Sequence, residues 1–98
     1  MKFGIGKLFL LDNSYYYYVC IESNNEEIVS IGKITKLLGI PTQELIEHFK
    51  KFNGIEFPVS DRNNYIYSDY YIFKKINQAS KTAAFLNEEY GVLLKLMG

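Results

Sequence analysis

The chain of 98 residues carries eleven lysines and arginines against eleven acidic residues, so its formal net charge is zero. Hydrophobic residues make up 48% and aromatic residues 16% of the sequence, which excludes an intrinsically disordered protein. A chain of this length is expected to fold as one domain, residues 1–98. The neutral balance also argues against the strongly basic class of nucleic-acid-binding proteins.

Cysteine usage and hydropathy point to the compartment. Cys20 is the single cysteine, so an internal disulfide is excluded, and its apolar neighbours predict a buried thiol. No apolar run approaches the roughly 18–20 residues that span a membrane. The N-terminal stretch is interrupted by Gly and Lys, unlike a signal peptide. We therefore expect a cytoplasmic protein without membrane contact.

Residues 3–11 and 15–22 predict two strands of a β-hairpin around the turn Asp12-Asn13-Ser14. The second strand opens with four consecutive tyrosines, Tyr15–Tyr18. Neither strand alternates cleanly between apolar and polar residues, which is typical of strands covered on both faces. We expect the hairpin to pack on helices and to offer the Tyr15–Tyr18 strand to a protein partner.

Residues 31–53 predict two helices joined by a tight corner. In the first, Ile31, Ile34 and Leu38 recur at helical spacing, with Ser30 placed as the N-terminal cap. Gly39 is placed to end this helix, because glycine adopts the left-handed conformation without a Cβ clash. Pro41 marks the start of the next helix, since proline has no amide hydrogen to lose there.

The second helix is predicted from Thr42 to Asn53, with Gly54 ending it. Its apolar face comprises Leu45, Ile46, Phe49 and Phe52. Its exposed face is expected to carry Gln43, Glu44, Glu47, His48, Lys50 and Lys51. Two short helices around a glycine-containing corner are typical of a helix-turn-helix, although an ordinary helical hairpin gives the same pattern.

A β-ribbon is predicted after the helical pair. It consists of residues 55–59, a polar turn at 60–64 and Tyr65–Tyr67, with Pro58 restricting its strand to an edge. A helix-turn-helix followed by such a ribbon is a winged helix. The sequence thus predicts an α+β fold: a winged helix-turn-helix (30–67) with an N-terminal β-hairpin (1–29) and a long C-terminal helix (68–98).

The last helix is expected to be capped by Ser68 and Asp69. From Ile72 its apolar residues follow the alternating spacing of four and three that is typical of a coiled-coil seam. The seam predicts a homodimer interface made of Ile76, Ala79, Ala83, Leu86, Tyr90, Leu93 and Met97. The alternative is a helix split near Asn87, whose two halves cover the chain's own core.

Two segments resemble MerR-type and excisionase-type winged-helix domains: residues 30–41 (SIGKITKLLGIP), and Tyr65–Asp69 followed by Ile72. The resemblance covers residues 30–76, extends loosely over 77–97 and leaves the hairpin out. It implies a DNA-binding regulator, or an accessory factor of a phage or mobile element, that dimerises through its C-terminal helix.

The chain departs from this family at two points. Ile46, Glu47 and His48 stand where the family has an arginine followed by aromatics, and Ile66 replaces an arginine of the wing. Residues 40–57 are also similar to the N-terminal helical domain of bacterial translation initiation factor 2, which reads no operator.

A DNA-binding role needs hydrogen-bonding groups on the exposed face of the second helix and cations for phosphates. Gln43 suits adenine in the major groove, and Asn63 and Asn64 suit the minor groove. The candidate DNA-binding residues are Lys33, Lys36, Thr42, Gln43, His48, Lys50, Lys51, Arg62, Asn63 and Asn64. Taken singly, each is better explained as a solvated surface residue, whereas together the cations suit a winged helix bound to a duplex.

Catalysis is not expected, because the chain has one histidine and one cysteine and no metal-ligand spacing. We therefore expect no enzyme, metal or cofactor. The main alternative to DNA binding is a protein-interaction module on the same scaffold, such as a phage- or virus-borne inhibitor or adaptor. Zero net charge, the tyrosine run and the missing arginine favour that alternative.

Overall fold

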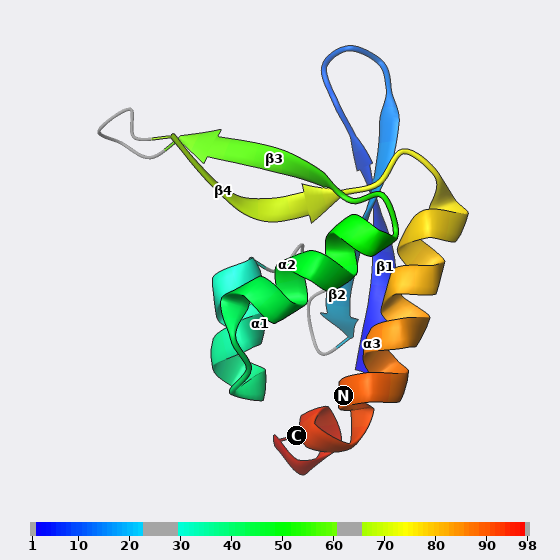
Figure 1. The fold of residues 1–98 in the computed structure, drawn as a ribbon. Helices are drawn as coiled ribbons and strands as arrows, with labels where there is room; N and C mark the ends of the chain where they lie inside the picture. Colours follow the sequence, from blue (N-terminus) through cyan, green and yellow to red (C-terminus); the bar gives the residue numbers. More distant parts are fainter. Residues whose placement is uncertain (1, 23–29, 61–65, 98) are drawn as a thin grey trace.

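The chain runs as β1 (Lys2–Phe9), β2 (Tyr15–Glu22), α1 (Ile31–Leu38), α2 (Thr42–Lys51), β3 (Ile55–Ser60), β4 (Ile66–Ile72) and α3 (Ile76–Met97) (Figure 1). This description comes from a computed structural model and covers residues 2–22, 30–60 and 66–97. Over these residues the fold is α+β, with three helices and two antiparallel sheets of two strands each. The predicted α+β class is thereby confirmed.

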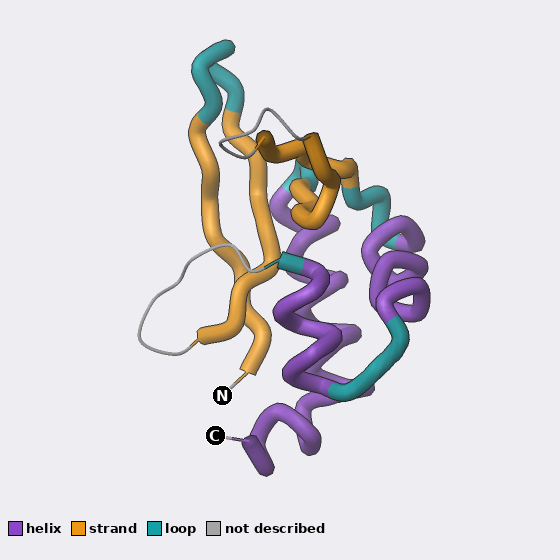
Figure 2. Tube along the Cα trace, turned by 90° about the vertical axis from the view of Figure 1, so that its left-hand side faces the viewer, coloured by secondary structure: helices purple, strands orange, loops and turns teal. Residues whose placement is uncertain are grey.

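Strands β1 and β2 form the predicted hairpin, in unbroken register from the pair Lys2–Glu22 to the pair Phe9–Tyr15. Its turn is closed by the Leu10 amide, which donates to the Ser14 carbonyl over 3.0 Å. Asn13 takes a positive φ of 65°, which asparagine tolerates better than most residues. Figures 1 and 2 both show the tip of this hairpin projecting beyond the rest of the molecule.

Strands β3 and β4 form the ribbon expected after the helices, and its register shifts between Phe57 and Pro58. A proline contributes no amide hydrogen to the ladder, so a local irregularity is expected beside it. The predicted helix cap at Ser68 and Asp69 is wrong. Strand β4 continues to Ile72, because its last three residues still pair with Ile55, Glu56 and Phe57 of β3.

Helix α3 begins at Ile76 and has a different N-terminal cap. The side-chain oxygen of Gln78 accepts a hydrogen bond from the Lys75 amide over 3.3 Å. This is the reciprocal half of a capping box, in which the third helical residue reaches back to the capping residue. The helix is continuous to Met97, so no split occurs at Asn87, and Figure 1 shows its last turns bending away from the earlier axis.

The two hairpins are joined where the chain leaves β4. The Tyr17 amide donates to the Phe73 carbonyl over 2.8 Å, and the Phe73 amide donates back to the Tyr17 carbonyl over 2.7 Å. Phe73 itself is fully buried. This single bridge fixes the second ribbon against the first, on the side of β2 that faces away from β1.

One cluster of buried apolar side chains connects both hairpins with all three helices. Its fully buried members include Ile34 of α1, Leu45 of α2, Phe73, and Leu86 and Leu94 of α3. Cys20 is also fully buried, as its apolar neighbours predicted.

Most residues of the predicted dimer seam on α3 belong to this core. Ala79, Ala83, Leu86 and Tyr90 are buried within the chain, so they are not available to a second copy. The seam is also interrupted, because Leu94 is buried in place of Leu93, which is 42% exposed. The buried stripe thus departs from the seven-residue repeat in the last turns of α3, where the helix covers the core of its own chain. Ile76, the first seam residue, is 55% exposed, and the side chain of Met97 lies outside the description.

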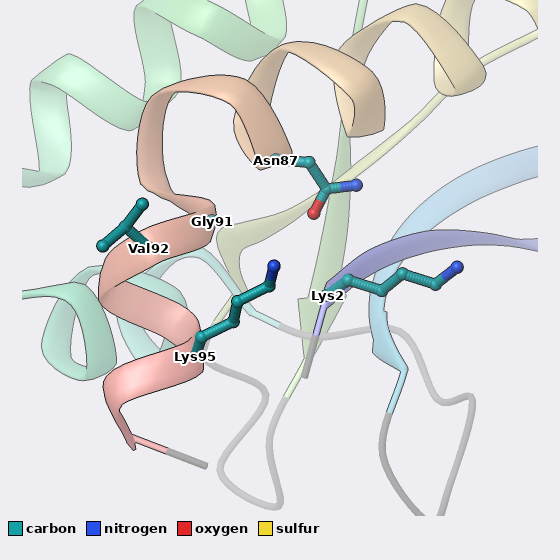
Figure 3. A pocket seen from close by; sticks show the side chains of 5 residues that line it. All are labelled: Lys2, Asn87, Gly91, Val92 and Lys95. Atoms are coloured by element: carbon teal, nitrogen blue, oxygen red, sulfur yellow. The ribbon is translucent and has the colours of Figure 1, made fainter.

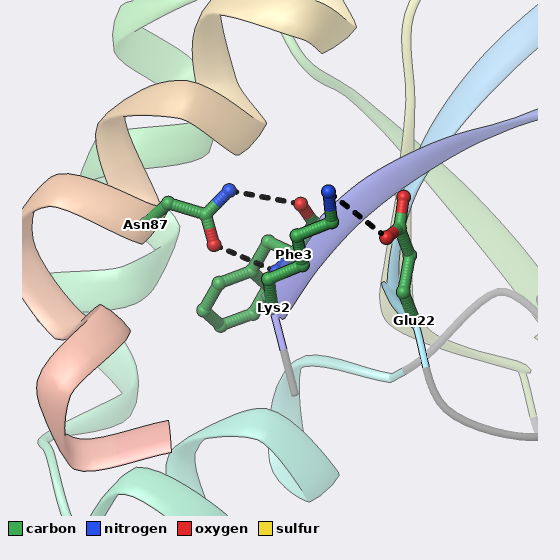
Figure 4. Close-up of polar contacts among 4 residues, drawn as sticks. All are labelled: Lys2, Phe3, Glu22 and Asn87. Atoms are coloured by element: carbon green, nitrogen blue, oxygen red, sulfur yellow. Dashed lines mark hydrogen bonds and ion pairs between the residues drawn. The ribbon is translucent and has the colours of Figure 1, made fainter. Parts of the chain in front are cut away.

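Asn87 connects α3 to the outer edge of β1 (Figure 4). Its side-chain oxygen accepts from the Phe3 amide over 2.7 Å, and its side-chain nitrogen donates to the Phe3 carbonyl over 2.9 Å. The amide of Asn87 therefore takes the place of a neighbouring strand at this one residue. On the other side of β1, Lys2 forms an ion pair with Glu22 at 3.5 Å.

Candidate nucleic-acid interface

Helix α1 begins and ends as its sequence predicts. The Ser30 hydroxyl oxygen accepts from the Lys33 amide over 3.2 Å, which satisfies one of the free amides of the first turn. Gly39 ends the helix with φ of 69°, and its amide donates to the Thr35 carbonyl over 2.8 Å. Ile31, Ile34 and Leu38 face the core, which leaves Lys33 and Lys36 exposed.

Helix α2 follows after a corner of only three residues, with Pro41 in the capping position. It ends at Lys51, two residues before the predicted end, and Asn53 takes the left-handed turn with φ of 67°. Gly54 comes next because the chain passes close to α2 there: a Cβ on Gly54 would lie 2.8 Å from the Phe49 carbonyl oxygen. The helix-corner-helix arrangement is thus present as predicted.

The polar side of α2 faces solvent. Leu45 and Phe49 are buried and Ile46 and Phe52 are half-buried, so the opposite side of the helix is left open. Its exposed side chains are Thr42, Gln43, Glu44, Glu47, Lys50 and Lys51. Two carboxylates and two ammonium groups lie on this face, so its formal charge is balanced.

His48 does not belong to the open face, contrary to prediction. Its ring is half-buried and lies 4.8 Å from the Phe85 ring, measured between centroids. Its Nε2 atom lies 2.9 Å from the Tyr90 hydroxyl oxygen. The physical reason is the position of α3 beside α2, which turns a residue at the border of the amphipathic pattern into a contact between helices.

Tyr90 is the centre of this contact. Its hydroxyl donates to the Glu44 carboxylate over 2.8 Å, so its oxygen is free to accept from a protonated Nε2 of His48. Burial, followed by the hydrogen bond to Glu44 and its negative charge, raises the pKa of Tyr90 above its ordinary value. Sequence reasoning placed Tyr90 in a dimer seam. An apolar seam does not need the tyrosine hydroxyl, so this group was the one feature of the sequence that indicated a polar partner.

Lys51 is also held in place. Its ammonium lies 5.1 Å from the Phe85 ring centroid and 5.6 Å from that of Phe52, within cation–π range. Lys50, on the same exposed turn, has no ion pair among the interactions recorded for the described residues. Arg62, Asn63 and Asn64, the predicted wing contacts, lie outside the described residues.

A separate shallow pocket of about 300 Å³ lies between the start of β1 and the last turns of α3 (Figure 3). Lys2, Asn87, Gly91, Val92 and Lys95 line it. Lys2 turns toward Glu22 instead of the pocket, as the two close-ups show. None of the candidate DNA-binding residues takes part, so the pocket is not an extension of the α1–α2 surface.

Comparisons with protein-family models, with curated proteins and with solved structures gave no match for this chain. The interpretation of the α1–α2 surface therefore depends on its geometry. Among the described helices, none combines the length and apolarity needed to cross a membrane. Within the same residues, no three His, Cys, Asp or Glu side chains gather closely enough to hold a metal ion.

Proposed function

We propose that the chain is a winged helix-turn-helix protein that binds duplex DNA through α1 and α2, as a regulator or accessory factor of phage or mobile-element type. The observation that carries the proposal is the open polar side of α2. This side follows a short corner, while the opposite side is anchored in the core by Leu45 and Phe49. A recognition helix needs this combination of a rigid back and a free polar front.

The two helices offer groups for both kinds of DNA contact. Thr42 and Gln43 lie exposed in the first turn of α2, the part of a recognition helix that usually meets base edges. Lys33 and Lys36 on α1 and Lys50 on α2 are exposed cations suited to phosphates. In this arrangement α2 enters the major groove, and the β3–β4 ribbon acts as the wing beside it.

Binding of a random-sequence duplex, measured by fluorescence anisotropy over a range of salt concentrations, tests the proposal. We expect affinity to fall steeply with salt, because binding to phosphates releases counterions. The variant Lys50→Glu should make the negative slope of log affinity against log salt concentration shallower by about 1. Lys81→Glu, an equal charge change at an exposed site on α3, should leave the slope unchanged. Equal effects of both variants, or no binding at low salt, would refute DNA binding by this face.

A protein-interaction module is the second candidate. Glu44 and Glu47 balance Lys50 and Lys51 on the exposed side of α2, and a face of mixed charge suits a protein better than a polyanion. On this alternative the folded protein shows no salt-dependent affinity for any duplex.

A further inference from the structure

We propose that two copies of this chain associate through the outer edge of β1, pairing the distal halves of their N-terminal hairpins. This inference is independent of DNA binding. It replaces the α3 seam, whose central residues are buried in the chain's own core, as the surface for self-association.

The bridge at Tyr17 shows which way the main-chain amides and carbonyls of β1 point. Both polar main-chain groups of Tyr17 bond to Phe73, away from β1. Tyr17 and its partner Lys7 are therefore a pair without mutual hydrogen bonds, and the main-chain groups of Lys7 point to the outer edge. Because the register is unbroken, Phe3, Ile5 and Phe9 point the same way.

Along this edge only Phe3 has a partner among the described residues, the side chain of Asn87. Beyond Phe3, β1 belongs to a sheet of two strands, so the outward amides and carbonyls of Ile5, Lys7 and Phe9 pair with no main-chain group of residues 2–22, 30–60 or 66–97. An open edge of this kind is a template for another strand. The hairpin tip carrying it projects from the molecule, which leaves room for that strand (Figure 1).

Three large apolar or aromatic side chains near the tip are exposed. Leu11 is fully exposed, and Phe9 and Tyr15 are each 54% exposed. The ammonium of Lys7 lies 4.0 Å from the Tyr15 ring centroid, and the Phe9 and Tyr15 rings lie 4.8 Å apart. The surface thus combines the Lys7 ammonium with aromatic and aliphatic side chains, and the polar turn Asp12–Ser14 borders it.

A second copy complements this surface in one antiparallel register. With the twofold axis at Leu8, Lys7 of each copy lies opposite Phe9 of the other, where a cation and an aromatic ring attract. A register centred on Lys7 would instead bring two like charges together, which is unfavourable. A register centred on Phe9 keeps fewer strand residues paired, since β1 ends there.

In this register the paired strand residues Lys7–Phe9 lie beyond Phe3, where α3 binds the edge of β1 through Asn87. Only the distal halves of the hairpins overlap, so the helical bodies lie at opposite ends of the combined four-stranded sheet. A twofold interface uses one patch on both copies, so every contact is formed twice. Because the interface involves only the ends of two hairpins, we expect a reversible dimer instead of an obligate one.

Disulfide trapping tests the register. In the proposed pair the two Leu8 residues face each other without mutual hydrogen bonds, with Cα atoms about 4.5 Å apart, within disulfide range. We expect Leu8→Cys to cross-link under mild oxidation, whereas Lys7→Cys, offset by about two residues from its copy, does not. The wild type is the control, because its Cys20 is fully buried. Cross-linking of Lys7→Cys alone would overturn the register.

Sedimentation equilibrium tests the surface itself. We expect the wild type to rise with concentration from 11.4 kDa toward twice that mass. Phe9→Asp should keep the protein monomeric. Val92→Asp introduces the same charge at an apolar residue of α3 that is 73% exposed, and this variant should still dimerise. Circular dichroism confirms that both variants are folded. A wild type that stays monomeric at all concentrations, or a dimer lost only in Val92→Asp, would overturn the proposal.

Discussion

The Nε2 atom of His48 and the hydroxyl oxygen of Tyr90 lie 2.9 Å apart and join α2 to α3. The same hydroxyl donates to Glu44, one turn earlier on α2. A single phenol therefore contacts two residues of the candidate recognition helix. This contact links α2 to α3 at the border of the exposed side of α2, so we expect it to contribute to the stability of the helix pair.

Removing the phenol oxygen is predicted to destabilise the fold. Tyr90→Phe should lower the free energy of unfolding by about 1–2 kcal/mol, since a hydrogen bond to a charged group is lost while the exposed Glu44 regains water. Urea denaturation followed by circular dichroism measures the change. Tyr15→Phe, at a half-exposed ring of the hairpin, is the matched control and should alter stability little. Equal losses in both variants would contradict the role given to Tyr90.

Alkaline pH should weaken the fold through Tyr71. Burial, the negative charge of Glu56 and the hydrogen bond to Glu56 raise the pKa of Tyr71 from 10.0 to about 12. Above pH 10 the unfolded chain loses this proton while the folded chain keeps it. The contribution of Tyr71 to stability is therefore complete below pH 10 and is lost as the pH rises toward 12.

The comparison of wild type with Tyr71→Phe isolates this effect from the other titrating groups. The difference in unfolding free energy between the two proteins should be constant below pH 10 and should shrink above it, as measured by urea denaturation. A difference that does not change with pH would show that Tyr71 titrates normally in the folded protein.

Two glycines should respond to alanine in opposite directions. Gly39→Ala should destabilise by about 1–2 kcal/mol, because φ is 69° and nothing lies within 4 Å of the added methyl group, so the loss is conformational. Gly91→Ala, inside α3 and also without close neighbours, should stabilise by up to about 1 kcal/mol. Thermal unfolding measures both. Destabilisation by Gly91→Ala would mean that the bend of α3 needs glycine.

Asn87→Ala should release the edge of β1. The variant leaves the Phe3 amide and carbonyl without their partners, which is predicted to destabilise by about 1–3 kcal/mol. Hydrogen exchange should accelerate at the Phe3 amide more than at the Gly6 amide, which pairs within the hairpin. Glu88→Ala, at the next exposed position, is the control. Unchanged exchange at Phe3 would contradict the strand-like role of Asn87.

Predictions that depend on neighbouring residues in the chain agree with the structure. The cap at Ser30, the left-handed stop at Gly39 and the turn at Asp12–Ser14 are each decided within a few residues, by main-chain conformation and local hydrogen bonds. The same local rules place Gln43 and Lys50 on the exposed side of α2, since amphipathic spacing is sufficient to identify that side.

Three predictions that depend on distant partners differ from the structure. The start of α3 was misplaced because β3 pairs with β4 as far as Ile72, which local capping signals at Ser68 and Asp69 do not reveal. His48 was placed on the open face because its contact with Tyr90 joins residues 42 positions apart. The α3 stripe was assigned to a dimer because apolar spacing cannot tell a chain's own core from a second copy.

The sequence by itself therefore determined the helices and strands described up to Ser60 and, except at His48, the polar side of α2, because short-range geometry and amphipathic spacing are sufficient for both. Only the tertiary structure decided that the apolar stripe of α3 is buried in the core and that, within the described part of the chain, the outer edge of β1 is left open beyond Phe3. Both outcomes depend on packing between helices and strands. The contacts involved join residues far apart in the sequence, so local spacing cannot predict them.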